Sequence, residues 1–329
     1  MSFSSPILPH DQAAILLDRL IDRVESVIIG KRQEIKMTII AMLCGGHVLL
    51  EDVPGVGKTM LVRTVAACLG CSFGRIQFTP DLMPSDITGT SVYHPRTAEF
   101  EFRPGPILSN IVLADEINRA TPRTQSALLE AMEERKVTVD GTTHQVPLPF
   151  LLLATQNPLQ FEGTYRLPEA QLDRFLMRLR IGYPSPAQEV ELLNRMQVHS
   201  PLDKIKPVLL AEELLAIQRQ VRTVFVDDSI KKYLVEVADA SRRHPKCALG
   251  ISPRGTLAWM NAAQAEAYLQ GRMYVIPDDA KAVATAVLSH RIALVPEAKI
   301  GGLSGEDIVS ELTAKIAVPM HRTAARTSL

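Results

Sequence analysis

One short segment limits the possible folds of this chain more than any other. Residues 52–59 read Asp-Val-Pro-Gly-Val-Gly-Lys-Thr, follow an apolar stretch at 47–50, and lead into a stretch of helical apolar spacing at 58–69. A glycine-rich turn between a strand and a helix directs backbone N–H groups and the positive helix end toward one point. The pattern predicts a phosphate-binding loop, with its strand in a sheet that helices cover.

The residue types in this loop suit a nucleoside triphosphate. Gly55 and Gly57 let successive N–H groups point inward, and Lys58 supplies a positive charge to the outer phosphates. Thr59 offers a hydroxyl to Mg²⁺. Asp52 stands where the motif usually has glycine. The residues expected to bind nucleotide from this segment are Pro54, Gly55, Val56, Gly57, Lys58, Thr59 and Met60.

Two other expected strands end in polar side chains. The strand at 110–114 leads to Asp115 and Glu116. Asp115 is predicted to hold Mg²⁺ through water, and Glu116 to act as the general base that orients the attacking water. The strand at 150–155 leads to Asn157, which can reach the γ-phosphate. Each pattern alone is weak, since surface strands often end in acids and Asn-Pro often opens a turn. Because the same chain also has a phosphate-binding loop, both strand ends are interpreted as parts of a nucleotide site.

Strand and helix signals alternate as far as a proline-containing turn near residue 184, where the strand signals stop. The sequence therefore predicts an α/β fold: an αβα sandwich with a parallel sheet in residues 1–184, followed by a smaller all-α lid domain in residues 185–329. Strands are expected at 47–50, 75–79, 110–114, 150–155 and 176–181. Helices are expected at 11–27, 33–44, 58–69, 188–198, 211–221, 228–243, 252–270 and 278–289.

Two segments depart from this alternation. The segment at about 86–108 is too long for a plain loop and is read as an insertion. The segment at about 136–147 has Asp140-Gly141 between β-prone arms, which predicts a hairpin.

The composition of the chain limits which partners and which cellular location are expected. Lys plus Arg equals Asp plus Glu at 36 each, so no overall field attracts nucleic acid, and a nucleic-acid partner is not expected. No apolar run approaches the length of a membrane span, and the first residues lack a secretory pattern. The expected location is the cytoplasm.

Taken together, these motifs resemble the AAA+ superfamily of ATPases and, within it, the MoxR family. The resemblance covers nearly the whole chain and rests on LLEDVPGVGKT at 49–59, ADEINRATPRTQSALLEAMEE at 114–134, ATQNP at 154–158, EGTYRLPEAQLDRF at 162–175 and GISPRG at 250–255. It implies ATP hydrolysis with ATP or ADP and Mg²⁺ bound. It further implies a ring homo-oligomer, expected to be a hexamer, that remodels or activates a protein client such as a von Willebrand factor A domain protein.

The same resemblance implies roles for individual residues. Asn157 corresponds to sensor 1, Arg174 to the arginine finger offered to the next subunit, and Arg254 to sensor 2. Ile29 and Gly30 correspond to the wall of the adenine pocket.

The segments at 86–108 and 136–147 correspond to the family's helix-2 insertion and to its hairpin before sensor 1. Arg166 stands where the family pattern has proline. It therefore stays open whether Arg166 or Arg119 shares the finger role. Arg119 and Arg123 are candidates for additional interface arginines.

Other functions fit parts of the pattern. A small-molecule kinase shares the phosphate loop but needs neither a base for water nor an arginine from a neighbouring subunit. A nucleic-acid motor or restriction-type GTPase of the same clade is a closer alternative, but the neutral overall charge and the absence of an appended DNA-binding module argue against it. A magnesium-chelatase-type subunit has the same insertions, and only its partners would distinguish it. An inactive nucleotide-gated scaffold is disfavoured because every hydrolytic group is present.

Overall fold

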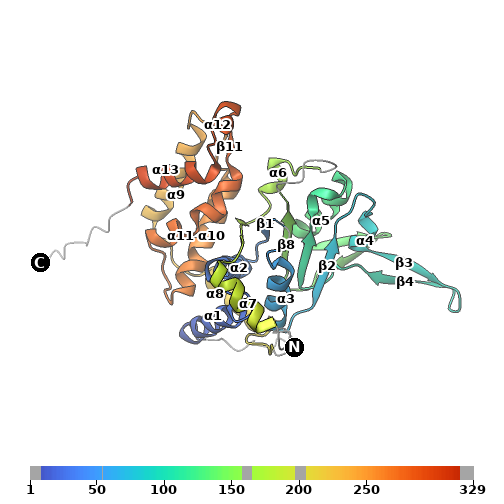
Figure 1. Cartoon of the computed structure of the whole chain (residues 1–329). Coiled ribbons are helices and arrows are strands. Elements are labelled where there is room, and N and C mark those ends of the chain that lie inside the picture. Colours follow the sequence, from blue (N-terminus) through green and yellow to red (C-terminus); the bar gives the residue numbers. More distant parts are fainter. Residues whose placement is uncertain (1–8, 54, 158–164, 197–204, 319–329) are drawn as a thin grey trace, which may run out of the picture. The chain divides into compact units, whose positions relative to one another are not determined.

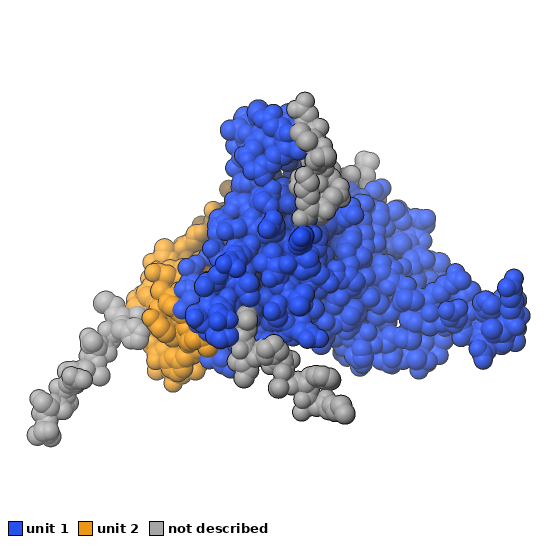
Figure 2. Space-filling view, turned by 90° about the horizontal axis from the view of Figure 1, so that it is seen from below, with its two compact units in different colours: residues 1–223, 269–271 blue, residues 224–268, 272–329 orange. Residues whose placement is uncertain are grey.

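The computed structural model describes residues 9–53, 55–157, 165–196 and 205–318. The chain divides into two compact units, residues 1–223 with 269–271 and residues 224–268 with 272–329, coloured separately in Figure 2. Helices between 185 and 223 thus belong to the first compact unit. The boundary near residue 184 between functional domains stays a prediction.

A five-stranded parallel sheet forms the centre of the first unit, in the order β2-β5-β8-β1-β9 (Figure 1). All five strands occur where the sequence predicts them, and the parallel α/β fold is confirmed. The three central strands, at 48–51, 111–115 and 151–156, read as nearly continuous apolar runs because helices cover both faces of such a sheet. The strands are β1 (Val48–Glu51), β2 (Phe73–Gln77), β5 (Ile111–Asp115), β8 (Leu151–Gln156) and β9 (Met177–Leu179).

Helices pack on both faces of this sheet. On one face, strand residues such as Leu49, Val112 and Leu152 share a buried core with Leu128 and Met132 of α5. On the other face, α3 packs against β5, α2 packs against β9, and α1 packs on α2 and α3. The helices of the first unit are α1 (His10–Glu25), α2 (Arg32–Leu43), α3 (Lys58–Cys68), α4 (Pro84–Thr88), α5 (Pro122–Glu134), α6 (Glu169–Leu172), α7 (Pro186–Met196) and α8 (Ala211–Val221), with the 3₁₀ turn η1 (Ile117–Arg119).

Two hairpins are added to this plan. Strands β3 (Gly89–His94) and β4 (Glu99–Pro104) follow α4, and their hairpin extends away from the sheet in Figure 1. Strands β6 (Lys136–Val139) and β7 (Thr142–Gln145) pair around Asp140 and Gly141. Both turn residues have positive φ, 49° and 78°, as a two-residue hairpin turn requires.

The second unit is mainly helical. Its core includes the buried rings of Tyr233 and Trp259, and the Trp259 indole donates to the Ala280 carbonyl at 2.7 Å. It departs from the all-α expectation in one antiparallel pair, whose strands are too short to show a period in the sequence. Within the described residues, no helix is long and apolar enough to cross a membrane. The elements are α9 (Asp228–Arg242), β10 (Cys247–Leu249), α10 (Pro253–Leu269), α11 (Pro277–Leu288), η3 (Ser289–Arg291), β11 (Ala293–Leu294), α12 (Pro296–Ile300) and α13 (Gly305–Lys315).

Candidate functional site

The phosphate loop joins β1 to α3 at the carboxyl end of the sheet. Gly55 and Gly57 have φ of 87° and 90°, in the region that only glycine enters without strain. A Cβ added at either position would meet no atom within 4 Å. Conformation, not crowding, therefore requires glycine here, and the space beside both residues is open. Pro54 lies outside the described residues.

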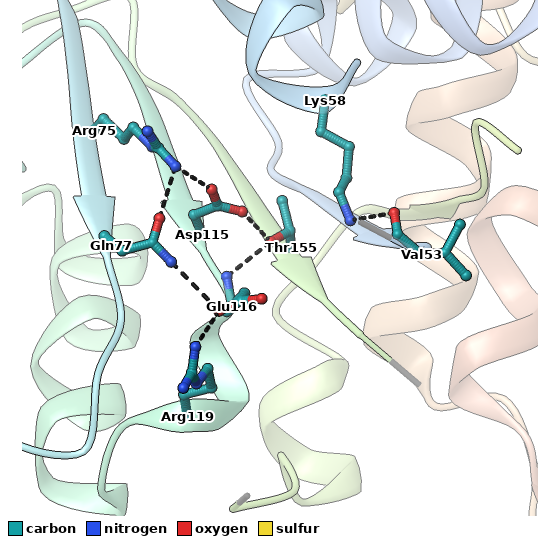
Figure 3. Close-up of polar contacts among 8 residues, drawn as sticks. All are labelled: Val53, Lys58, Arg75, Gln77, Asp115, Glu116, Arg119 and Thr155. Carbon is teal, nitrogen blue, oxygen red and sulfur yellow. Dashed lines mark hydrogen bonds and ion pairs between the residues drawn. The ribbon is translucent and has the colours of Figure 1, made fainter. Parts of the chain in front are cut away.

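Lys58 is the first residue of α3 and folds back over the loop. Its ammonium donates to the carbonyl oxygens of Asp52 and Val53 at 3.0 and 3.2 Å, and Figure 3 shows the second contact. Burial lowers the pKa of this ammonium, and the carboxylates of Asp52, Asp115 and Glu116 oppose the shift. Lys58, which is predicted to bind the outer phosphates, therefore lies in the electrostatic field of Asp115 and Glu116. Thr59 follows it in the first helical turn, where the helix dipole favours anions.

An apolar cavity of about 240 Å³ lies beside the loop. It brings together the predicted residues Ile29, Gly55, Val56, Gly57 and Met60. Such mainly apolar, concave linings are typical of sites for a ring-bearing ligand. The cavity lining comprises Val27, Ile28, Ile29, Lys31, Gly55, Val56, Gly57, Met60, Pro184, Leu192 and Arg195.

One wall of the cavity was not predicted from the sequence. It comes from α7 and the turn before it, through Pro184, Leu192 and Arg195. Gly30 is not part of the lining. It has φ of 69°, and a Cβ there would lie 1.8 Å from the side-chain amide of Gln188 on α7.

The acid pair lies at the end of β5. One carboxylate oxygen of Asp115 accepts from the Thr155 hydroxyl at 2.7 Å, and the other accepts from the Arg75 guanidinium at 2.7 Å. The Asp115 side chain is 15% exposed. Figure 3 shows the network.

Glu116 has an unusual backbone for a residue with a side chain. Its φ and ψ are 58° and 50°, in the left-handed region, and such strain persists only where the surroundings impose it. Its N–H donates to the Thr155 hydroxyl at 2.8 Å. Its carboxylate accepts from Arg119 at 2.8 Å and from Gln77 at 3.4 Å. Thr155 therefore holds the side chain of one acid and the backbone of the other (Figure 3).

Three residues of this network, Arg75, Gln77 and Thr155, were not predicted from the sequence. Gln77 ends β2 and pairs in register with Asp115 of the neighbouring strand. The rule that identified Asn157, a polar side chain at the end of a parallel strand, could have found it. Arg75 lies two residues earlier and donates to the Gln77 amide oxygen at 2.7 Å. Nothing in the sequence distinguishes its charge from that of a surface arginine.

Asn157 follows β8 and is 6% exposed. Because β8 lies between β5 and β1 in the sheet, this residue comes between the acid pair and the phosphate loop. The register supports this placement, with Gln156 of β8 opposite Glu51 of β1.

Arg174 lies at the other end of the sheet. Its guanidinium is 3.2 Å from the Glu133 carboxylate on α5, and Leu176 N–H donates to the carbonyl of His47, just before β1. These are the amino ends of the strands. A six-residue strand such as β8 spans about 17 Å. Arg174 is therefore separated from the acid pair of its own chain by the length of the sheet.

The other candidate arginines are distributed over the molecule. Arg119 pairs with its own Glu116, as described above. Arg123 is in the first turn of α5, and Arg166 lies just before α6. Arg254 is exposed in the first turn of α10, in the second unit.

Comparison with known proteins identifies the family. Residues 47–177 match the family model "ATPase family associated with various cellular activities (AAA)", and residues 239–312 match the model "AAA lid domain". The chain is 43% identical to Chaperone MoxR1 of Mycobacterium tuberculosis, over 92% of this chain and 82% of that protein. The chain belongs to the MoxR family of AAA+ ATPases.

Further similarities agree with this assignment. Uncharacterized protein YeaC of Bacillus subtilis is 54% identical, over 94% of this chain and 97% of that protein. A crystal structure from Cytophaga hutchinsonii, described as a candidate ATPase, superposes with a TM-score of 0.89 at 38% identity, covering 94% of this chain and 97% of that chain. As a MoxR-family AAA+ protein, the chain is an ATP hydrolase.

Membership of the MoxR family implies binding of a nucleotide with a divalent metal. The donor set fits a hard cation, because Thr59 and Asp115 offer hydroxyl and carboxylate oxygens, which Mg²⁺ prefers. The Asp115 carboxylate already binds one cation, the Arg75 guanidinium.

Proposed function

We propose that this MoxR-family protein hydrolyses ATP with Mg²⁺ at sites shared between neighbouring subunits of a ring, and uses the cycle to remodel a protein client. One observation carries the proposal. The groups for binding phosphate and activating water lie at the carboxyl end of the sheet, whereas Arg174 lies at the amino end. A second copy of the chain can supply Arg174 to a site that its own chain cannot complete.

Within one subunit, the phosphate loop binds the triphosphate and the apolar cavity binds adenine. Thr59, and Asp115 through a water molecule, would hold Mg²⁺. Bound Mg²⁺ neutralises charge that develops on the phosphate oxygens. Arg254 of the second unit would contact the phosphates as sensor 2.

Glu116 orients a water molecule and accepts its proton as the water oxygen attacks the γ-phosphorus. The bond from the γ-phosphorus to its bridging oxygen breaks, which gives ADP and inorganic phosphate. Asn157, between the acid pair and the loop, would hold the γ-phosphate or this water. For the Glu116 carboxylate to reach the water, its contacts with Arg119 and Gln77 must rearrange.

The protein client is inferred from relatives. The name Chaperone MoxR1 supports a chaperone-like action on other proteins. A von Willebrand factor A domain client, a hexameric ring and a cytoplasmic location are parts of this proposal that the family resemblance suggests.

Two substitutions test the nucleotide chemistry. Lys58→Ala removes the charge at the outer phosphates, and we expect tight binding of a fluorescent ATP analogue to be lost. Glu116→Gln keeps shape but removes the proton acceptor, and we expect normal binding with turnover reduced by about 100-fold or more. If Lys58→Ala binds as the unaltered protein does, or Glu116→Gln turns over within about threefold of it, the assigned roles are wrong.

A further inference from the structure

Asp52 departs from the usual phosphate-loop motif, and its environment explains what the carboxylate does. The residue is 7% exposed. One of its carboxylate oxygens accepts from the N–H groups of Ile181 and Gly182 at 2.6 and 2.7 Å, and the other accepts from Val53 N–H at 3.0 Å. Three backbone groups from two separate segments thus converge on one side chain.

The segment that Asp52 holds leads directly to the wall of the apolar cavity. Gly182 is followed by Pro184, which lines the cavity, and then by α7, which contributes Leu192 and Arg195. Asp52 itself begins the phosphate loop, whose Gly55 and Gly57 line the same cavity. The carboxylate is therefore a direct connection between the loop that binds phosphate and the wall against which a base would pack.

Further hydrogen bonds connect this wall to the rest of the first unit. Arg195 donates to the Ser26 carbonyl at 2.6 Å, and the Lys31 ammonium donates to the Tyr183 carbonyl at 3.1 Å. The residues of α7 are otherwise largely exposed, so packing alone holds the helix weakly. Of these three connections, the one from Asp52 starts in the phosphate loop.

The chemistry of this position favours a positioning role. A negative charge beneath a loop that binds phosphate opposes the anion, so electrostatics alone disfavours aspartate there. Glycine would avoid this repulsion but would leave the buried Ile181 N–H without the acceptor it has now. A carboxylate that accepts three N–H bonds offsets its charge with fixed dipoles and holds the two segments together.

We propose that Asp52 is a positioning residue that fixes the base-binding wall of the cavity to the phosphate loop, so that both ends of a nucleoside triphosphate are bound at once. The inference rests on the proposed function, since it assumes that the cavity takes the adenine of ATP. Asp52 then affects affinity for the nucleoside part of the ligand more than for the phosphates.

The test compares two ligands that share the phosphates and differ in the nucleoside. Isothermal titration measures Mg²⁺-ATP and Mg²⁺-tripolyphosphate binding to the full chain with Asp52, with Asp52→Gly and with Asp52→Asn. We expect Asp52→Gly to weaken ATP binding about tenfold, as expected when a pre-organised wall is lost. Tripolyphosphate binding should stay within about twofold or become tighter, because a repelling charge is gone. Asp52→Asn, which keeps the shape and one acceptor oxygen, should lie between.

Leu192→Ala provides the matched variant, because it alters the same wall from α7. It should weaken ATP binding and spare tripolyphosphate, and the double variant with Asp52→Gly should lose less than the two single effects together. The inference is overturned if Asp52→Gly binds ATP and tripolyphosphate with equally reduced affinity, or if it binds ATP as the unaltered protein does. If Asp52→Gly does not fold, as checked by thermal unfolding, the same comparison with Asp52→Asn decides. Failure of the unaltered protein to bind ATP would instead refute the proposed function.

Discussion

The two ends of the central sheet are built from different chemistry. At the carboxyl end, charged, amide and hydroxyl groups from β2, β5 and β8 form one network around Asp115 and Glu116. At the amino end, His47 is buried and fixed by uncharged contacts: its ring accepts from Leu152 N–H at 3.0 Å and lies 3.3 Å from the Met132 carbonyl. The described groups expected to bind phosphate and metal within one subunit, Lys58, Thr59 and Asp115, lie at the carboxyl end.

This difference explains the position of Arg174. The amino end packs β1, β8 and the end of α5 together, and Arg174 emerges there beside Glu133. Because the chain folds around parallel strands, the arginine and the acid pair cannot meet within one subunit. The separation agrees with the proposed division of the catalytic groups between two subunits.

The largest expected effect comes from Arg174→Ala. We expect ATP binding to be kept and hydrolysis to fall by about 10³-fold or more, the effect of removing an arginine finger. Steady-state phosphate release and ATP titration measure the two properties. Arg243→Ala, an exposed arginine on the second unit, is the control and should keep full activity. A turnover of Arg174→Ala close to that of the control would remove the catalytic role from the amino end.

A smaller effect is expected from Thr155, which is buried beside both acids. Thr155→Val removes the donor to Asp115 and the acceptor for Glu116 N–H, so we expect hydrolysis to fall about tenfold to 100-fold and to need more Mg²⁺. Thr155→Ser keeps the hydroxyl and should restore most activity.

Thr38→Val is the matched control for Thr155, since Thr38 is equally buried and its hydroxyl donates only to the Glu34 carbonyl within α2. It should leave both the rate and the Mg²⁺ dependence unchanged. If Thr155→Val and Thr38→Val behave alike, Thr155 contributes packing and does not position the acids.

The smallest expected effect concerns stability at the amino end. Burial lowers the pKa of the His47 imidazole from 6.5 to about 4, aided by the nearby Arg135 charge. The folded state therefore binds a proton less readily than the unfolded state. The stabilisation from neutral His47 is complete above pH 6.5 and is lost as the pH falls toward 4. Between pH 7.5 and 5 this loss is about 2 kcal/mol.

Chemical denaturation of the unaltered protein and of His47→Gln at both pH values measures this contribution. The variant should be less stable at pH 7.5 but should lose about 2 kcal/mol less on acidification. Equal losses in both proteins would show that His47 does not titrate as the buried site requires.

Much of the fold was predictable because its signals are local. The five strand segments, the glycine loop and the Asp140-Gly141 turn each depend on a few adjacent residues. The acid pair and the phosphate loop were predictable for the same reason. The positioning role of Asp52 was not predictable, because it accepts hydrogen bonds from the backbone of Ile181 and Gly182, more than a hundred positions away.

Arg75 and Arg195 show the same limit for side chains. An arginine in a sequence carries no sign of whether it faces solvent, an acid or a cavity. Arg75 becomes part of the acid network only because β2 pairs with β5 in a particular register. Arg195 lines the cavity only because α7 returns to the helix that carries Ser26 at its end.

The most direct test of the shared site mixes two inactive proteins. In rings that contain Arg174→Ala and Glu116→Gln subunits, some interfaces combine an intact Lys58, Asp115 and Glu116 with an intact Arg174 from the neighbour. Differently tagged subunits that co-purify would establish that mixed rings form, and phosphate release would then be measured. The account predicts recovered hydrolysis in the mixture, although each protein alone is nearly inactive. Mixed rings without recovery would contradict it, and would mean that Arg174 acts within its own subunit or that Arg166 or Arg119 is the finger.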